Sequence, residues 1–128
     1  MDHHVLLSLF HIFAVVPFFI YIGVQRAATP EPVFNGLLGL AGAMLLYHLY
    51  KAYKKSISGD SSLWVNLVHI ILVAPLMMWI GYYKKETSRS AFELLLLLAF
   101  SALGYHLYSL TLMFSTVSGD GHNRGQTK

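Results

Sequence analysis

The sequence alternates long apolar blocks with short polar connections. Four blocks lack lysine and arginine and span 18 to 24 residues each: 5–24, 33–50, 63–83 and 91–114. Because an α-helix rises 1.5 Å per residue, about 20 apolar residues cross the hydrocarbon core of a bilayer. Strands of a membrane barrel would alternate apolar and polar positions over about 10 residues, whereas Leu94 to Phe100 is continuously apolar. The pattern predicts four transmembrane helices.

The composition favours the same environment. Apolar residues make up 55% of the 128 residues, charged residues 12%, and the mean hydropathy is +0.55. A soluble domain carries about 25% charged residues to cover its surface. We therefore expect an integral, multi-pass membrane protein whose main partner is the lipid bilayer. Cysteine is absent, which excludes disulfides and thiolate ligands.

An internal repeat with a period of 58 residues runs through the chain. Residues 5–50 align with residues 63–108 without a gap, with 18 identities in 46 positions. The identities include histidine, proline, glycine, threonine and tyrosine, so shared hydrophobicity does not explain them. We interpret the chain as a duplicated two-helix hairpin, with repeat one at 2–59 and repeat two at 60–117.

The duplication determines the expected topology. Each repeat crosses the membrane twice, so both copies enter in the same direction and are related by a pseudo-two-fold axis along the membrane normal. Connections of about eight residues within each hairpin and about twelve between them make neighbouring helices antiparallel. We expect an all-α integral membrane four-helix bundle of two parallel repeats, one transmembrane domain over residues 1–117, and a flexible polar tail over residues 118–128.

Proline and glycine residues mark candidate packing features. Pro17 and Pro75 occupy equivalent positions inside the first and third blocks, where each removes a backbone donor and predicts a kink or a hinge. Gly36, Gly39 and Gly42 in the second block predict close helix packing.

The basic residues do not form a nucleic-acid site. The pI is about 9.2, but the nine lysines and arginines are scattered over connections and tail, so no nucleic-acid partner is expected. Five lie on the side of the termini: Lys51, Lys54, Lys55, Arg124 and Lys128. Four lie on the other side: Arg26, Lys84, Lys85 and Arg89. The positive-inside rule therefore favours cytoplasmic termini by a narrow margin.

One histidine falls in each predicted helix: His11, His48, His69 and His106. His11 lies about 9 Å into the first helix at helical rise, and His48 lies near the end of the second helix, which returns to the same surface. The repeat puts His69 and His106 at corresponding depths. We expect all four imidazoles in one layer below one membrane surface.

Polar neighbours accompany these histidines. Ser8 lies one turn before His11 and Asn66 one turn before His69, which predicts that these helix faces point toward other helices. Tyr47 and Tyr105 directly precede the other two histidines and could orient them or bind a haem propionate. Ser8, Asn66, Tyr47 and Tyr105 are therefore candidate cofactor-binding residues.

The histidine layer predicts a metal- or haem-binding site, for electron transfer or metal handling. Four imidazoles could bind one copper, zinc or iron ion, and an opposed pair could supply both axial ligands of haem b. Two alternatives remain open: a structural or assembly protein without a cofactor, and a histidine-gated proton or ion path.

Enzymatic function is less favoured, because no phosphate loop, nucleophile elbow or dinucleotide fingerprint is present and no catalytic residues are assigned. A homo-oligomer or another membrane-protein partner is compatible with so small a chain.

Two stretches carry a resemblance. These are Val65-Asn66-Leu67-Val68-His69-Ile70, followed by Ala74-Pro75, and the Tyr-His-Leu-Tyr block at residues 47–50 and 105–108. In these stretches the chain resembles small duplicated four-helix membrane proteins encoded by large DNA viruses of algae. The resemblance covers nearly the whole chain and implies a membrane location and a viral context, without implying an activity.

Overall fold

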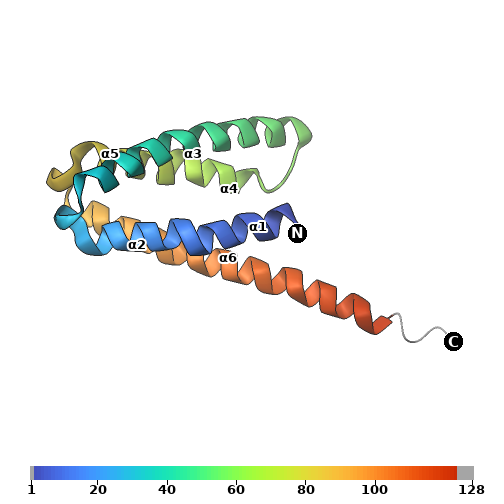
Figure 1. Ribbon diagram of the computed structural model, residues 1–128. Coiled ribbons are helices and arrows are strands. Elements are labelled where there is room, and N and C mark those ends of the chain that lie inside the picture. Colours follow the sequence, from blue (N-terminus) through green and yellow to red (C-terminus); the bar gives the residue numbers. More distant parts are fainter. Residues whose placement is uncertain (1, 124–128) are drawn as a thin grey trace. The chain divides into compact units, whose positions relative to one another are not determined.

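The computed structural model describes the backbone of residues 2–123 and the side chains of residues 2–118, and every regular element in that range is helical (Figure 1). The elements, in chain order, are α1 (His3–Phe10), η1 (His11–Val15), α2 (Val16–Gln25), η2 (Arg26–Ala28), α3 (Glu31–Ser58), α4 (Leu63–Val68), η3 (His69–Val73), α5 (Ala74–Tyr83), η4 (Lys84–Glu86) and α6 (Arg89–Asn123). The all-α prediction is confirmed.

Within the described residues, these elements join into four continuous helical segments that are long and apolar enough to cross a membrane. They are His3–Ala28, Glu31–Ser58, Leu63–Glu86 and Arg89–Ser118. Each contains one predicted block and is longer than that block. Two of the blocks, 33–50 and 63–83, end at the first lysine, whereas backbone hydrogen bonding continues through lysine and other good helix formers.

The connection between the repeats is shorter than predicted. Only Gly59–Ser62 separates α3 from α4, instead of about twelve residues. Gly59 ends α3 with a φ of 69°, a left-handed conformation that glycine adopts without steric cost. Asp60 Oδ1 then accepts bonds from the backbone N–H and the hydroxyl of Ser62, both at 2.8 Å. These two bonds, the backbone one foremost, lower the pKa of Asp60 below its ordinary value.

α6 continues to Asn123 and so reaches into the stretch predicted to be a polar tail from residue 118. Extending an existing helix adds one hydrogen bond for each residue fixed, which is less costly than nucleating a new one. The remainder of the predicted tail, residues 124–128, lies outside the described residues.

Both prolines inside the first and third helical segments follow a π-helical turn. η1 ends at Val15, two residues before Pro17, and η3 ends at Val73, two residues before Pro75. In each turn the closing amide reaches the carbonyl five residues back: Val16 to His11 and Ala74 to His69. The wider turn accommodates the proline ring and its missing N–H, and each histidine therefore begins a π turn.

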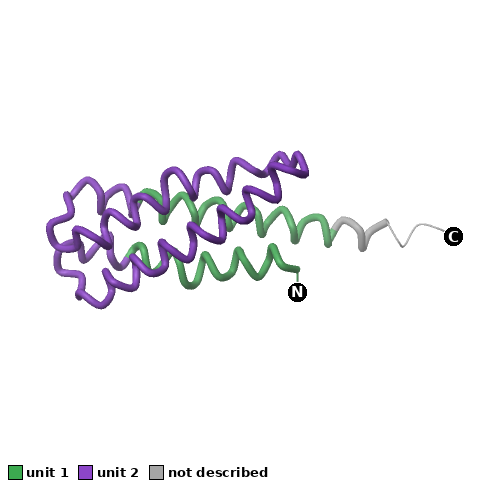
Figure 2. The backbone as a smooth tube through the Cα atoms, turned by 90° about the horizontal axis from the view of Figure 1, so that it is seen from above, with its two compact units in different colours: residues 1–20, 97–128 green, residues 21–96 purple. Residues whose placement is uncertain are grey.

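The chain divides into two units, coloured separately in Figure 2. Unit 1 comprises residues 1–20 and 97–128, and unit 2 comprises residues 21–96. In unit 2, α3 packs against α4, η3 and α5, and η2 lies against η4. The buried residues of unit 2 are mostly large and apolar; they include Ile22, Phe34, Leu37, Met77, Ile80, Phe92 and Leu95.

The glycines that permit close packing are not the predicted ones. A Cβ added to Gly36, Gly39 or Gly42 would meet nothing within 4 Å. At Gly81 it would lie 2.9 Å from Leu38 Cβ, and at Gly23 it would lie 2.5 Å from Leu96 Cγ. The close approach thus occurs at the two glycines that the repeats share, and the prediction for Gly36, Gly39 and Gly42 is wrong within the described chain.

The two hairpin ends have the same backbone path. Arg26 and Lys84, 58 residues apart, have φ angles of 51° and 52°, which are uncommon for residues other than glycine. After each, the amide of a threonine bonds back to that residue's carbonyl, Thr29 at 3.0 Å and Thr87 at 3.1 Å. Each chain reversal is therefore closed by a single 3₁₀ turn.

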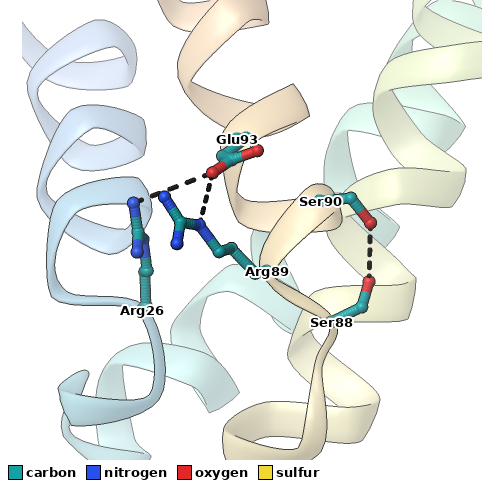
Figure 3. Close-up of polar contacts among 5 residues, drawn as sticks. All are labelled: Arg26, Ser88, Arg89, Ser90 and Glu93. Atoms are coloured by element: carbon teal, nitrogen blue, oxygen red, sulfur yellow. Dashed lines mark hydrogen bonds and ion pairs between the residues drawn. The ribbon is translucent and has the colours of Figure 1, made fainter.

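Ion pairs surround these reversals. Glu93 accepts a bond from Arg89 Nε at 2.6 Å and lies 3.9 Å from Arg26 Nη2 (Figure 3). Glu31 accepts one from Lys84 Nζ at 2.7 Å. Exposed pairs of this kind contribute about 1 kcal/mol or less each. They place charged groups at the end of unit 2 that is distant from His48 along α3 and from His69 along the third helical segment.

Candidate functional site: two stacked histidine pairs

In unit 2, His48 of α3 and His69 at the start of η3 stack face to face. Their ring centroids are 4.1 Å apart and their planes differ by 13°. His48 is 8% exposed, and its Nδ1 lies 3.0 Å from Asn66 Oδ1, so the ring N–H donates to the amide oxygen. The stack and the hydrogen bond together join α3 to α4 and η3.

Unit 1 contains the equivalent arrangement. His11 at the start of η1 and His106 of α6 stack with centroids 4.3 Å apart and planes 25° apart. His106 Nδ1 lies 3.3 Å from Ser8 Oγ, and both residues are buried. These contacts join α1 and η1 to α6.

Each pair combines one histidine from each repeat. His48 of repeat one stacks on His69 of repeat two, and His11 of repeat one stacks on His106 of repeat two. Adding 58 to the repeat-one member of each pair gives the repeat-two member of the other pair, His48 to His106 and His11 to His69. The predicted inward orientation is confirmed for the four buried residues Ser8, His48, Asn66 and His106.

The other member of each pair is held by its own helix. His11 Nδ1 lies 2.8 Å from the carbonyl oxygen of Leu7, and His69 Nδ1 lies 2.7 Å from that of Val65. A carbonyl oxygen only accepts, so both rings carry a proton on Nδ1. In the neutral form the lone pair is then on Nε2, as in many metal-binding histidines.

The tyrosines predicted to act with the histidines lie at the edge of the site. Tyr47 and Tyr105 are 39% and 45% exposed. Their rings meet the neighbouring histidines edge-on, at centroid distances of 5.2 Å for Tyr47 with His48 and 5.3 Å for Tyr105 with His106. They extend the aromatic surface of each pair.

The rings of one pair do not fit a shared metal ion. A metal bound to an imidazole lies about 2 Å from the nitrogen and close to the ring plane, where the lone pair is. Two nearly parallel planes about 4 Å apart have no such point in common, and stacked rings do not face a haem iron from opposite sides. Over residues 2–118, histidine, aspartate and glutamate form no group of three or more that could hold a metal ion. The metal or haem site stays a prediction.

Asn66 retains one polar atom that the described residues do not satisfy. Its Oδ1 binds His48, but its Nδ2 is buried without a hydrogen-bond partner. Ser8, the equivalent residue, has a single hydroxyl, which lies against His106. The two pairs thus share a geometry but differ in the polar group that supports it.

Sequence reasoning identified all four histidines and missed how they combine. The repeat gives their equivalent positions along the helices, but pairing depends on which helices become neighbours. It also missed the ion pairs at the hairpin ends, although the charged residues at positions 26, 31, 84 and 93 lie beside the two reversals. No protein-family model matches the chain, and no curated protein and no solved structure shows significant similarity to it.

Proposed function

We propose that this chain is a multi-pass integral membrane protein, built from a duplicated helical hairpin, whose two histidine pairs make its helix packing respond to pH. Four long apolar helical segments support membrane insertion. So does the surface they present, where large apolar side chains such as Phe13, Ile71 and Leu46 are more than 70% exposed. Water would oppose this exposure, whereas lipid favours it.

Structural equivalences at a separation of 58 residues support the duplication. They cover the π turns before Pro17 and Pro75, the positive φ angles of Arg26 and Lys84, and the histidine pairs themselves. Such local details follow the sequence rather than the general requirements of a helical bundle.

The stacked pairs are the observation that carries the proposed pH response. Two neutral imidazoles stack without repulsion, and one charged ring is tolerated by its neighbour. Two charged rings about 4 Å apart repel by about 4 kcal/mol at the effective dielectric constant of a protein near its surface. Because acid favours the charged form of imidazole, a fall in pH is expected to loosen each pair.

A packing response is better supported than conduction. Beyond the histidines, the buried residues within the spans are almost all apolar, for example Val16, Phe19, Leu37 and Met77. A conducted proton needs successive polar groups, and beyond the histidines, Ser8 and Asn66 the buried side chains described within the spans are apolar.

The two pairs should respond to different extents. In unit 2, the loop Gly59–Ser62 joins α3 and α4 close to the pair. In unit 1, the pair joins α1 to α6, which lie at opposite ends of the sequence, so no short loop restrains them. As the pH falls from about 7.5 to about 5, across the titration range of imidazole, we expect unit 1 to open more than unit 2.

Spin labels can measure this response. The chain has no cysteine, so cysteines introduced at Leu6 and Leu112 report on unit 1 and cysteines at Tyr53 and Leu67 on unit 2, in nanodiscs and without a histidine tag. We expect the unit 1 distance distribution to broaden and lengthen in acid.

Asp60 should not contribute to the change of distance with pH, because its pKa is held below the ordinary carboxyl value. Replacing both His11 and His106 with phenylalanine keeps stacked rings and should abolish the response; identical distances at both pH values in the unsubstituted protein would refute it.

Metal or haem ligation is the second candidate. It is favoured by the bonds from the Nδ1 atoms of His11 and His69 to backbone carbonyls, which fix the ring proton on Nδ1 as in many metal-binding histidines. The untagged protein should then show a Soret band or near-stoichiometric metal. Either signal should be lost in a variant with His11 and His69 both replaced by alanine. A colourless, metal-free protein that stays empty when haem, copper and zinc are offered would contradict this candidate. If the spin-label distances were also the same at both pH values, the histidines would have only a structural role in helix packing.

A further inference from the structure

A cavity of about 280 Å³ lies at one hairpin end of unit 2. It is lined by residues from the start of α3 and the end of the third helical segment: Glu31, Phe34, Tyr83, Lys84, Lys85 and Glu86. Glu31 precedes His48 by 17 residues, which is about 26 Å along α3 at helical rise. If the segments span a bilayer, as proposed above, the cavity opens at the membrane surface opposite the histidines.

The cavity is charged but carries no net charge. Lys84 is paired with Glu31 at 2.7 Å. Lys85 and Glu86 are exposed, and among the described residues neither has a hydrogen bond or a close ion pair; Lys85 has only a longer-range electrostatic attraction to Glu31. One ammonium and one carboxylate are therefore available side by side to an incoming group that carries both charges.

The surroundings are those of a lipid interface. Tyr83 lines the cavity, and its ring lies 4.4 Å from that of Trp79, one turn earlier. Tyr82, Tyr83 and Trp79 are 71%, 41% and 53% exposed. Tyrosine and tryptophan concentrate at headgroup level, where their rings meet acyl chains and their polar atoms meet water.

We propose that this cavity binds the headgroup of phosphatidylethanolamine. Its phosphate accepts hydrogen bonds from Lys85, and its primary ammonium donates to Glu86, so both unpaired side chains are neutralised. The quaternary ammonium of phosphatidylcholine has no N–H to donate. Phosphatidylglycerol has no cation and leaves Glu86 unpaired.

The other hairpin end provides an internal comparison. At the equivalent positions, Gln25, Arg26, Ala27 and Ala28 replace Tyr83, Lys84, Lys85 and Glu86. The only charged residue among them, Arg26, lies against Glu93. We therefore expect one headgroup site in each chain.

Lipid retention tests the proposal. The full chain, reconstituted in vesicles with equal amounts of phosphatidylethanolamine, phosphatidylcholine and phosphatidylglycerol of the same acyl composition, is extracted in mild detergent, and bound lipids are counted by native mass spectrometry. We expect about one retained phosphatidylethanolamine per chain. Lys85→Ala and Glu86→Gln should each reduce its retention about tenfold, the effect of losing one charge-assisted hydrogen bond.

Arg89→Ala is the matched control. Like Lys85→Ala, it removes a positive charge from this end of unit 2. Arg89 does not line the cavity, so the retention of phosphatidylethanolamine should not change. Equal retention of the three lipids, or unchanged retention in the Lys85 and Glu86 variants, would overturn the proposal.

Failure of the membrane assignment gives a different result. Protein that fractionates as soluble after carbonate extraction would refute the proposed function itself. Protein that stays in the membrane but retains phosphatidylethanolamine no better than phosphatidylcholine would refute the lipid site alone.

Discussion

Gly81→Ala is expected to destabilise the protein by roughly 1–2 kcal/mol, although alanine is the better helix former. The new Cβ would lie 2.9 Å from Leu38 Cβ and about as close to the Leu38 backbone, at 3.0 Å from N and 3.1 Å from Cα. Backbone cannot turn aside as a side chain can, so α5 and α3 must move apart. Overpacking of this kind costs about 1–3 kcal/mol, against a gain of about 1 kcal/mol in helix propensity.

Two further glycines make this prediction specific. At Gly23 the added methyl meets mainly the Leu96 side chain, which can change rotamer, so Gly23→Ala should cost less than Gly81→Ala. At Gly36 it meets nothing, so Gly36→Ala should be neutral or stabilising by up to about 1 kcal/mol. Reversible unfolding in mixed micelles, followed by tryptophan fluorescence, gives the three free energies. Equal effects at Gly81 and Gly36 would contradict the close approach of α5 to α3.

His48→Leu is expected to cost roughly 2–3 kcal/mol. The substitution removes the stack on His69 and leaves Asn66, already without a partner at Nδ2, unsatisfied at Oδ1 as well. A buried polar atom that loses its partner carries a desolvation cost of about 1–3 kcal/mol.

The matching double-mutant cycle separates the hydrogen bond from packing. Asn66→Leu alone should also destabilise, because the buried His48 Nδ1 then loses its acceptor. The double variant should lose about 1–2 kcal/mol less than the sum of the single variants, since no orphaned polar partner remains. Strictly additive losses would mean that the bond between His48 and Asn66 contributes nothing. Tyr47→Phe removes only the hydroxyl of a side chain that is 39% exposed. Its free energy of unfolding should stay within about 0.5 kcal/mol of that of the original protein.

The sequence predicted the helices well, because each one contains a long apolar run. A helix that crosses hydrocarbon needs an uninterrupted apolar run, and such runs are visible without any tertiary information. The helix ends were predicted less well, since Lys54, Lys55 and Arg89 interrupt hydropathy without interrupting hydrogen bonding. The connection between the repeats was overestimated for the same reason.

The sequence predicted which residues form the candidate site, but it did not predict how their rings are arranged. The repeat marked His11, His48, His69 and His106 as equivalent and indicated Ser8 and Asn66 as their neighbours. The repeat also suggested that the four imidazoles bind one ion, because counting possible ligands takes no account of how the rings are oriented. The orientations of the rings depend on Nδ1 bonds to Leu7, Val65, Ser8 and Asn66, and these bonds lead to stacking.

Glycine illustrates the same division. Three glycines at small-residue spacing in α3 predicted close contact, yet they face no neighbour among the described residues. Gly23 and Gly81 permit the contact instead, because the neighbouring helix approaches at their level. The sequence gives the size of each side chain, but it does not show which helix will lie next to that side chain.

The sequence by itself determined the helical class, the number of long apolar segments, the 58-residue repeat and the identity of the polar residues inside those segments. These properties follow from composition and order along one chain, where lipid solvation and helical rise are the only physics needed. The tertiary structure alone decided that each histidine stacks on a histidine of the other repeat and that Lys85 and Glu86 share a cavity with Glu31. Such contacts depend on which helix faces stay in contact once side-chain packing and hydrogen bonds across helices are satisfied together, and linear spacing does not encode that choice.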